Sequence, residues 1–244
     1  MARMCTPLWQ NWQFADTFEK QYLYPDCGDE PFTEIQLPHT VKEIPYNYFD
    51  EKMYQLHCCY RKKFAVSPQL EGMRLFIDFA GVMSAAQVFI NGKQAGEHRG
   101  GYVPFSVDIT DFVTYSEGED NLLVVAVDST ERPDTPPFGG SIDYLCYGGI
   151  YADVTLRAVP QCSIASIYAR PLVVIGTEKS LAVDIAIVQN ERTHKPVDVS
   201  VALFDSRNRK RAELSKRIEV SVPEVSLSMI MDELTGIKLW TLEK

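Results

Sequence analysis

Short segments in which apolar and polar residues alternate follow one another along this 244-residue sequence, and Gly, Pro and Asx residues separate them. An alternation of period two is typical of half-buried β-strands, and the longer period of an amphipathic helix is scarce here. Asn91-Gly92 stands between two extended runs and predicts a hairpin, because both positions tolerate a positive φ. The pattern predicts an all-β fold, with its first strands at residues 74–79, 87–90, 93–97, 105–109, 122–127 and 153–159.

The segment 122–127 is apolar at every position, which predicts a strand covered on both faces. Behind it, residues 129–149 are so rich in Pro and Gly that regular structure is excluded through most of the segment. Loops of this length in a compact domain are typically functional or disordered. Four large side chains indicate a packed, functional loop: Phe138, Tyr144, Leu145 and Tyr147.

A second group of alternating segments begins after Pro160, and its spacing suits a small immunoglobulin-type sandwich. The basic run 207–211 is interpreted as a solvated turn between two strands, and residues 239–243 as the start of a last strand. The expected domains are residues 1–159 and residues 160–244, the second being truncated. Strands in the second domain are expected at residues 166–171, 180–188, 196–204 and 217–222.

Charge and length exclude several classes of protein. The chain carries 24 Lys and Arg against 33 Asp and Glu, a net charge of −9, which argues against nucleic acid and anionic membranes as partners. No apolar run of about 18 residues occurs, so no transmembrane helix is expected. A complete (β/α)8 barrel needs ~250 residues for itself, so this chain cannot hold one beside two sandwiches.

The six cysteines form no Cys-x-x-Cys pair and the histidines are scattered, so no zinc site is predicted. Cys58 and Cys59 are adjacent in a predicted strand and should point to opposite faces. Six reduced thiols in a cytoplasmic protein are the preferred interpretation. A secreted or periplasmic protein whose signal peptide had been removed would give the same sequence.

A series of short segments then makes the sequence recognisable by its order. The segments are Trp12–Phe14, Leu37–Thr40, Tyr60–Phe64, Phe79–Val82, Val88–Gly92, Gly96–Phe105, Asp108–Thr110, Asn121–Asp128 and Gly148–Val154. Together, over residues 9–159, they resemble glycoside hydrolase family 2, which contains β-galactosidases, β-glucuronidases and β-mannosidases. One departure is Ala152, where the family often has Arg, so any ion pair of that Arg is absent or replaced.

The resemblance implies a galactose-binding-domain-like jelly roll, then an immunoglobulin-like sandwich, then a barrel that carries two catalytic Glu residues. Leu239–Glu243 is similar to the family's Leu-Trp-Ser-x-Glu near the end of the second sandwich. The chain thus looks like the N-terminal, non-catalytic region of a glycosidase, preferably a β-galactosidase that hydrolyses terminal β-glycosidic bonds. The fragment alone is expected to be inactive, and no catalytic residue is predicted in it.

Two other functions stay open at this stage. One is a free-standing carbohydrate-binding β-sandwich module without hydrolase activity, and the other is a structural or adhesive pair of sandwiches. A reading frame that continues beyond Lys244 would favour the enzyme, and a stop codon there would favour the other two. The expected partners are a β-galactoside or related β-glycoside, the chain's own C-terminal barrel and further copies in a homo-oligomer. No cofactor is predicted in this chain, although the full-length enzyme could use a divalent or monovalent cation.

Asp128 is the first candidate site residue. It follows an apolar strand and opens the Pro/Gly loop, so from the residues alone it can be a turn-forming Asp that caps the strand end. In β-galactosidase-like members an Asp at this strand end reaches the mouth of the barrel and binds sugar hydroxyls. The resemblance therefore implies that Asp128 binds substrate through charge-assisted hydrogen bonds. Asn47, between Tyr46 and Tyr48, is a looser second candidate.

Two further groups have both a structural and a functional interpretation. Residues 98–102 predict a tight turn over Tyr102 and Phe105, with a sugar contact by His98 or Arg99 as the alternative. The aromatic rings of the loop could stack on a sugar, or they could pack in the core or against the missing barrel. These rings belong to Tyr144 and Tyr147.

Overall fold

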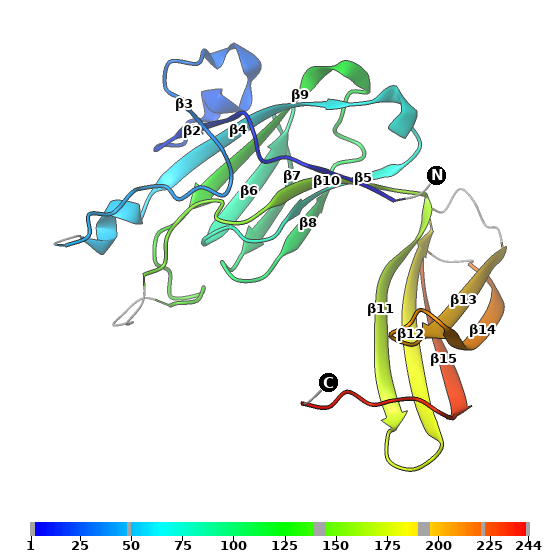
Figure 1. Cartoon of the computed structure of the whole chain (residues 1–244). Coiled ribbons are helices and arrows are strands. Elements are labelled where there is room, and N and C mark those ends of the chain that lie inside the picture. Colours follow the sequence, from blue (N-terminus) through cyan, green and yellow to red (C-terminus); the bar gives the residue numbers. More distant parts are fainter. Residues whose placement is uncertain (1–2, 48–49, 139–144, 190–195, 221–222, 243–244) are drawn as a thin grey trace. The chain divides into compact units, whose positions relative to one another are not determined.

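The computed structural model of the chain describes residues 3–47, 50–138, 145–189, 196–220 and 223–242 (Figure 1). Its internal contacts divide it into two compact units, Met1–Pro160 and Gln161–Lys244. Nearly all regular structure is antiparallel sheet, and the described helices are short 3-10 turns at Lys20–Leu23 (η1), Pro25–Cys27 (η2), Glu51–Tyr54 (η3) and Pro68–Leu70 (η4). Within the described ranges, no helix combines the length and the apolar character needed to cross a membrane.

The first unit contains two antiparallel sheets. The four-stranded sheet has the order β1-β10-β5-β8, with bounds Met4–Pro7, Val154–Val159, Arg74–Phe79 and Phe105–Asp108. The six-stranded sheet has the order β3-β2-β4-β9-β6-β7, with bounds Thr33–Ile35, Trp12–Ala15, His57–Val66, Ser116–Asp128, Ala85–Ile90 and Lys93–Arg99. This is the jelly-roll sandwich that the family resemblance implies.

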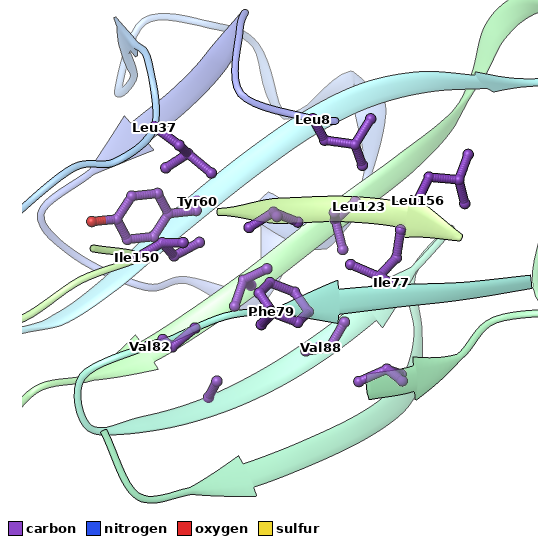
Figure 2. Close-up of a cluster of buried hydrophobic side chains, with 14 of the residues drawn as sticks. Leu8, Leu37, Tyr60, Ile77, Phe79, Val82, Val88, Leu123, Ile150 and Leu156 are labelled. Carbon is purple, nitrogen blue, oxygen red and sulfur yellow. The ribbon is translucent and has the colours of Figure 1, made fainter. Parts of the chain in front are cut away.

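Alternate residues of both sheets fill the space between them. Figure 2 shows Ile77 and Phe79 of β5 beside Val88 of β6 and Leu123 of β9. All four side chains are almost completely buried. Burying an aliphatic or aromatic side chain of this size contributes roughly 1.5–3 kcal/mol, so this layer is the main source of stability of the unit.

Strand β9 is buried on both faces, as its uninterrupted apolar run predicts. Leu123 belongs to the main core, whereas Val124 packs in a second cluster on the opposite face. That second cluster includes Tyr22 of η1, so the segment around η1 covers this face of the six-stranded sheet. Cys58 and Cys59 of β4 lie in these two different clusters, which confirms that they point to opposite faces.

The predicted hairpin joins β6 to β7. Asn91 and Gly92 both have positive φ, 51° and 80°, which a two-residue turn of this kind requires. The Asn91 side chain also accepts a hydrogen bond from the amide of Leu122 at 2.8 Å and donates one to Asn121 at 3.0 Å. The same turn residue therefore closes the hairpin and attaches it to β9.

The second unit is an immunoglobulin-like sandwich of two small sheets. One sheet has the order β11-β12-β15, with bounds Cys162–Val173, Lys179–Gln189 and Glu224–Leu234. The other pairs β13 (Pro196–Phe204) with β14 (Lys210–Glu219). Its core contains the inward residues of β12 and β15, together with Val199 of β13, and includes Val183, Ile185, Ile187, Leu227 and Met229.

Two strand predictions in this unit need correction, and one further strand was not predicted. The strand expected at 217–222 ends at Glu219 and begins as early as Lys210, and β15 lies outside all of the predicted strands. Residues 239–242 are in no strand, because they pair with none of the described strands, and Trp240 is exposed. The basic run begins in the turn that follows Asp205 and continues into β14, which confirms a turn between two strands.

Candidate functional site

Asp128 ends β9 in the middle of the six-stranded sheet. In the register it lies opposite His57 of β4 on one side and Ala85 of β6 on the other. Ala85 in turn pairs with Arg99 of β7. Because paired residues of antiparallel strands share a face, these four side chains form one row across four strands.

A cavity of about 200 Å³ lies at this row. The next row of the same face, with Ala126 and Gln87 at its centre, completes the floor. The small alanine side chains in both rows leave space above the sheet, and charged side chains surround this space. The cavity is therefore shallow and polar, which suits a hydroxyl-rich ligand better than an apolar one.

Thr130 holds one oxygen of the Asp128 carboxylate. Its amide donates to Asp128 Oδ1 at 3.0 Å, and its hydroxyl donates to the same oxygen at 2.6 Å. This is the turn-forming, strand-capping arrangement that the sequence allows. The second oxygen, Oδ2, accepts from Arg132 Nη1 at 3.3 Å, and the side chain keeps 28% of its surface exposed. Since a carboxylate offers about four acceptor positions, Asp128 can cap the strand and still accept hydroxyl protons.

The carboxyl group of Asp128 is kept ionised. Partial burial alone would raise its pKa, but the hydrogen bonds from Thr130, the nearby charge of His57 and the hydrogen bond from Arg132 outweigh burial. The pKa therefore lies below its usual value. An ionised Asp128 can only accept hydrogen bonds, so the site would bind hydroxyl groups as donors.

A chain of alternating charges crosses the rim of the cavity. Arg132 contacts Asp128 and also donates from Nε to Asp134 at 3.2 Å. Asp134 in turn accepts from Arg99 at 3.1 Å. These ion pairs attach the start of the Pro/Gly loop to β7, so the loop and the sheet edge form one wall.

The backbone behind Asp128 is fixed by buried contacts. Its carbonyl oxygen accepts from the amide and hydroxyl of Ser84, at 3.3 and 3.1 Å. The buried hydroxyl of Ser129 accepts from the amide of Leu56 and donates to the carbonyl of Tyr54 at 2.6 Å. The position of Asp128 is therefore determined by β9, by the segment from η3 to the start of β4 and by the loop before β6 together.

Two of the recognisable sequence motifs meet beside this site. His39 donates its amide to Ile150 O at 2.9 Å, and Val41 donates to Gly148 O at 2.9 Å. On its other side, Gly149 exchanges two backbone hydrogen bonds with Met83, at 2.9 and 3.0 Å. The Leu37–Thr40 turn and the Gly-Gly-Ile segment are therefore structural supports of the strand ends around Asp128.

His98 packs within the turn at residues 98–102, as the structural interpretation of this segment predicts. His98 stacks on Phe105 with ring centroids 4.2 Å apart, and its Nε2 contacts Gly100 O at 3.1 Å. The expectation that Tyr102 packs beneath the turn is wrong, because this side chain is exposed and contacts Cys146 Sγ through its hydroxyl. Arg99 lies on the cavity rim but is ion-paired.

Asn47 is exposed in a bend and does not line the cavity at Asp128, so its proposed sugar contact stays a prediction. Tyr147 is partly exposed near Tyr54, and Tyr144 lies outside the described residues. Sequence reasoning missed His57 and Arg132. No local signal marks His57, because it reaches the site only through the long-range pairing of β4 with β9, whereas Arg132 lies four residues after Asp128.

The described residues contain no group of three or more His, Cys, Asp or Glu side chains that could hold a metal ion. All six cysteines are free thiols. Burial raises the pKa of the Cys59 thiol to about 12, so this thiol is kept protonated.

The fold and this cavity define a class of protein. It is an all-β chain in which a jelly roll, with a polar cavity at its strand ends, precedes an immunoglobulin-like sandwich. The family model described as "Glycosyl hydrolases family 2, sugar binding domain" matches residues 13–160. The chain belongs to glycoside hydrolase family 2, and it corresponds to the N-terminal region of these glycosidases.

Relatives with two activities resemble the chain. It is 36% identical over 241 residues to a β-galactosidase of Thermoanaerobacterium thermosulfurigenes, covering 99% of this chain and 33% of that protein. It is 43% identical over 171 residues to a β-glucuronidase of Bacteroides fragilis, covering 69% of this chain and 23% of that protein. The chain thus spans a third or less of the length of these relatives.

Solved structures show the same fold. Bacteroides uniformis β-glucuronidase 2, bound covalently to cyclophellitol-6-carboxylate aziridine, matches with a TM-score of 0.87 at 24% identity. The match covers 98% of this chain and 29% of that chain. Both sandwiches therefore have counterparts in the N-terminal part of a known glycosidase.

Proposed function

We propose that this chain is the N-terminal, non-catalytic region of a β-galactosidase. The observation that carries the proposal is the 36% identity to a β-galactosidase over 99% of the chain, which extends through both units. In this proposal, catalysis belongs to a C-terminal barrel with two Glu residues. The jelly roll contributes Asp128 to one wall of the substrate pocket.

The charges around Asp128 support a neutral sugar. Arg132 and Arg99, the two arginines of the cavity, are both ion-paired to aspartates. Neither arginine can bind a uronic acid carboxylate without losing its aspartate partner. Ionised Asp128 would also repel that carboxylate.

A β-glucuronidase is the second candidate, because the chain is 43% identical over 171 residues to one from B. fragilis. The experiment that separates the two uses the protein encoded by the complete reading frame. We expect it to release nitrophenol from 4-nitrophenyl β-galactoside faster than from the β-glucuronide. Faster release from the glucuronide would establish the second candidate.

A free-standing carbohydrate-binding module is the alternative without enzyme activity. The reading frame beyond Lys244 distinguishes it from the main proposal. Several hundred further codons with alternating strand and helix patterns support the glycosidase, and a stop codon at this position supports the module. Size-exclusion chromatography of the protein from the complete reading frame would show whether its copies associate.

We also propose a cytoplasmic location, on the basis of six free thiols. Fractionation of the source cells with an antibody to the chain tests it. Recovery in the soluble cytoplasmic fraction is the expected result, and recovery from the periplasm or medium would contradict the proposal.

A further inference from the structure

A second cavity, of about 390 Å³, lies over strands β3, β2 and β4, and none of its lining residues lines the cavity at Asp128. Gln13 of β2 stands at its centre, paired with Glu34 of β3 on one side and Arg61 of β4 on the other. Its volume falls within the range of small-molecule sites.

The polar groups of the cavity are mixed. Asp29, Glu34 and Glu119 supply carboxylates, Gln13 an amide, and Arg61 and Lys63 cationic donors. The Gln13 amide donates to Asp29 Oδ1 at 2.8 Å, which holds both groups in place. A hydroxyl group can donate one hydrogen bond and accept others, so a wall of interleaved donors and acceptors suits a polyhydroxylated ligand.

Arg61 gives an independent sign of a ligand. Its side chain is completely buried, and it makes no ion pair within the described part of the chain. Nη1 donates to Cys27 Sγ at 3.0 Å and Nη2 to Tyr24 O at 3.1 Å, but buried Nε has no hydrogen-bond partner among the described residues. Buried polar atoms are nearly always satisfied, so this unmatched donor indicates that an acceptor is missing from the surroundings of a cavity residue.

One apolar surface completes the wall. The half-buried ring of Phe32 lines the cavity and lies 4.6 Å from the Arg61 guanidinium carbon. Small-molecule sites combine such a surface with a few directed polar groups. The C–H face of a pyranose ring would pack on Phe32 while its hydroxyls reach the strand residues.

We propose that this cavity binds a neutral sugar, independently of the site at Asp128. Three carboxylates against two cations leave the lining with an excess of negative charge, which disfavours a uronic acid. The proposal fits a family module described as a sugar-binding domain. It does not depend on whether the full-length protein is a β-galactosidase.

The test uses the 244-residue chain labelled with ¹⁵N. Methyl β-D-galactopyranoside is titrated and the amide shifts are followed, with methyl β-D-glucuronide as the charged comparison. We expect saturable shifts at Gln13 and Glu34, with about millimolar affinity because the ligand has only about a dozen heavy atoms. The glucuronide should bind more weakly.

Substitutions test whether the galactoside binds in this cavity. Gln13→Ala and Glu34→Ala should each weaken it roughly fivefold or more, as expected when a hydrogen bond is lost. Glu219→Ala, an exposed strand carboxylate in the second unit, should leave the affinity unchanged. Circular dichroism confirms that each variant is folded.

Three results would overturn the proposal: no saturable shift with the galactoside, binding that survives both cavity substitutions, or loss of binding in Asp128→Asn alone. Equal affinity for the glucuronide would contradict the assignment of a neutral ligand.

Discussion

The amide and the hydroxyl of Thr130 both donate to the same oxygen of Asp128, at 3.0 and 2.6 Å. This leaves Oδ2 with Arg132 as its only side-chain donor among the described residues. Capping of the strand therefore occupies one oxygen of the carboxylate and leaves acceptor positions on the other, so the two interpretations of Asp128 are compatible.

The capping role predicts how substitutions of Asp128 affect stability. Asp128→Asn keeps an acceptor for Thr130 and should change the unfolding free energy of the chain by less than about 1 kcal/mol. Asp128→Ala removes the acceptor and should cost about 1–2 kcal/mol. Urea unfolding of both variants measures the difference, and equal losses would show that the turn does not depend on this acceptor.

Gly149 cannot carry a side chain. It has φ of +113°, and a Cβ there would stand 2.5 Å from the Tyr60 hydroxyl and 2.9 Å from His39 O. Gly149→Ala should therefore destabilise the first unit by about 2–4 kcal/mol.

Gly28→Ala is the matched control for that substitution, because Gly28 has φ of +79° with nothing within 4 Å of the added Cβ. Its ψ of 168° lies in a region that only Gly adopts readily, so the substitution should cost about 1–3 kcal/mol from the backbone alone, less than Gly149→Ala, which adds steric overlap. Similar melting temperatures for the two variants would show that the close approach to Tyr60 does not matter.

His39 makes stability depend on pH. Burial lowers its pKa, and its Nδ1 lies 2.9 Å from the Tyr60 hydroxyl. The unfolded chain binds the His39 proton more readily than the folded chain does. The stability that neutral His39 contributes is therefore complete above pH ~6.5, and it is lost as the pH falls towards the pKa of His39 in the folded chain. The melting temperature should therefore drop between pH ~7.5 and pH ~5.5, and less so in His39→Gln. An identical drop in both would exclude His39 as the cause.

Arg157 forms a two-point contact with Asp78, at 2.5 and 2.8 Å, and both side chains are largely shielded from solvent. Arg157→Met should cost about 1–2 kcal/mol of unfolding free energy. Arg170→Met, at the more exposed pair with Asp184, should cost less. Differential scanning calorimetry of the two variants compares them, and an equal or larger loss at Arg170 would contradict this ranking.

The strands of the first unit can be predicted because their burial is regular. The run 122–127 is apolar throughout because β9 is covered on both faces, and Arg74–Phe79 alternates because one face of β5 meets the core. In the second unit the alternation of apolar and polar residues is interrupted. Ile230 puts an apolar residue on the exposed face of β15, and Lys216 breaks the series Ala212, Leu214, Ile218 in β14.

The site can be predicted only in part, for a related reason. Asp128 can be found because it ends a strongly marked strand within a recognisable order of motifs. Its neighbours His57 and Arg99 reach it through the pairing of β9 with β4 and with the β6–β7 hairpin, and register between strands distant in sequence is not encoded locally. Gln13 and Arg61 of the second cavity likewise meet only through the pairing of β2 with β4.

The kinetics of the full-length protein with Asp128→Asn test the account most directly. If Asp128 holds sugar hydroxyls, loss of its charge should lower kcat/KM for 4-nitrophenyl β-galactoside by about tenfold or more, with the melting temperature unchanged. Unchanged kinetics in the folded variant would contradict a role in substrate binding and leave Asp128 as a strand cap.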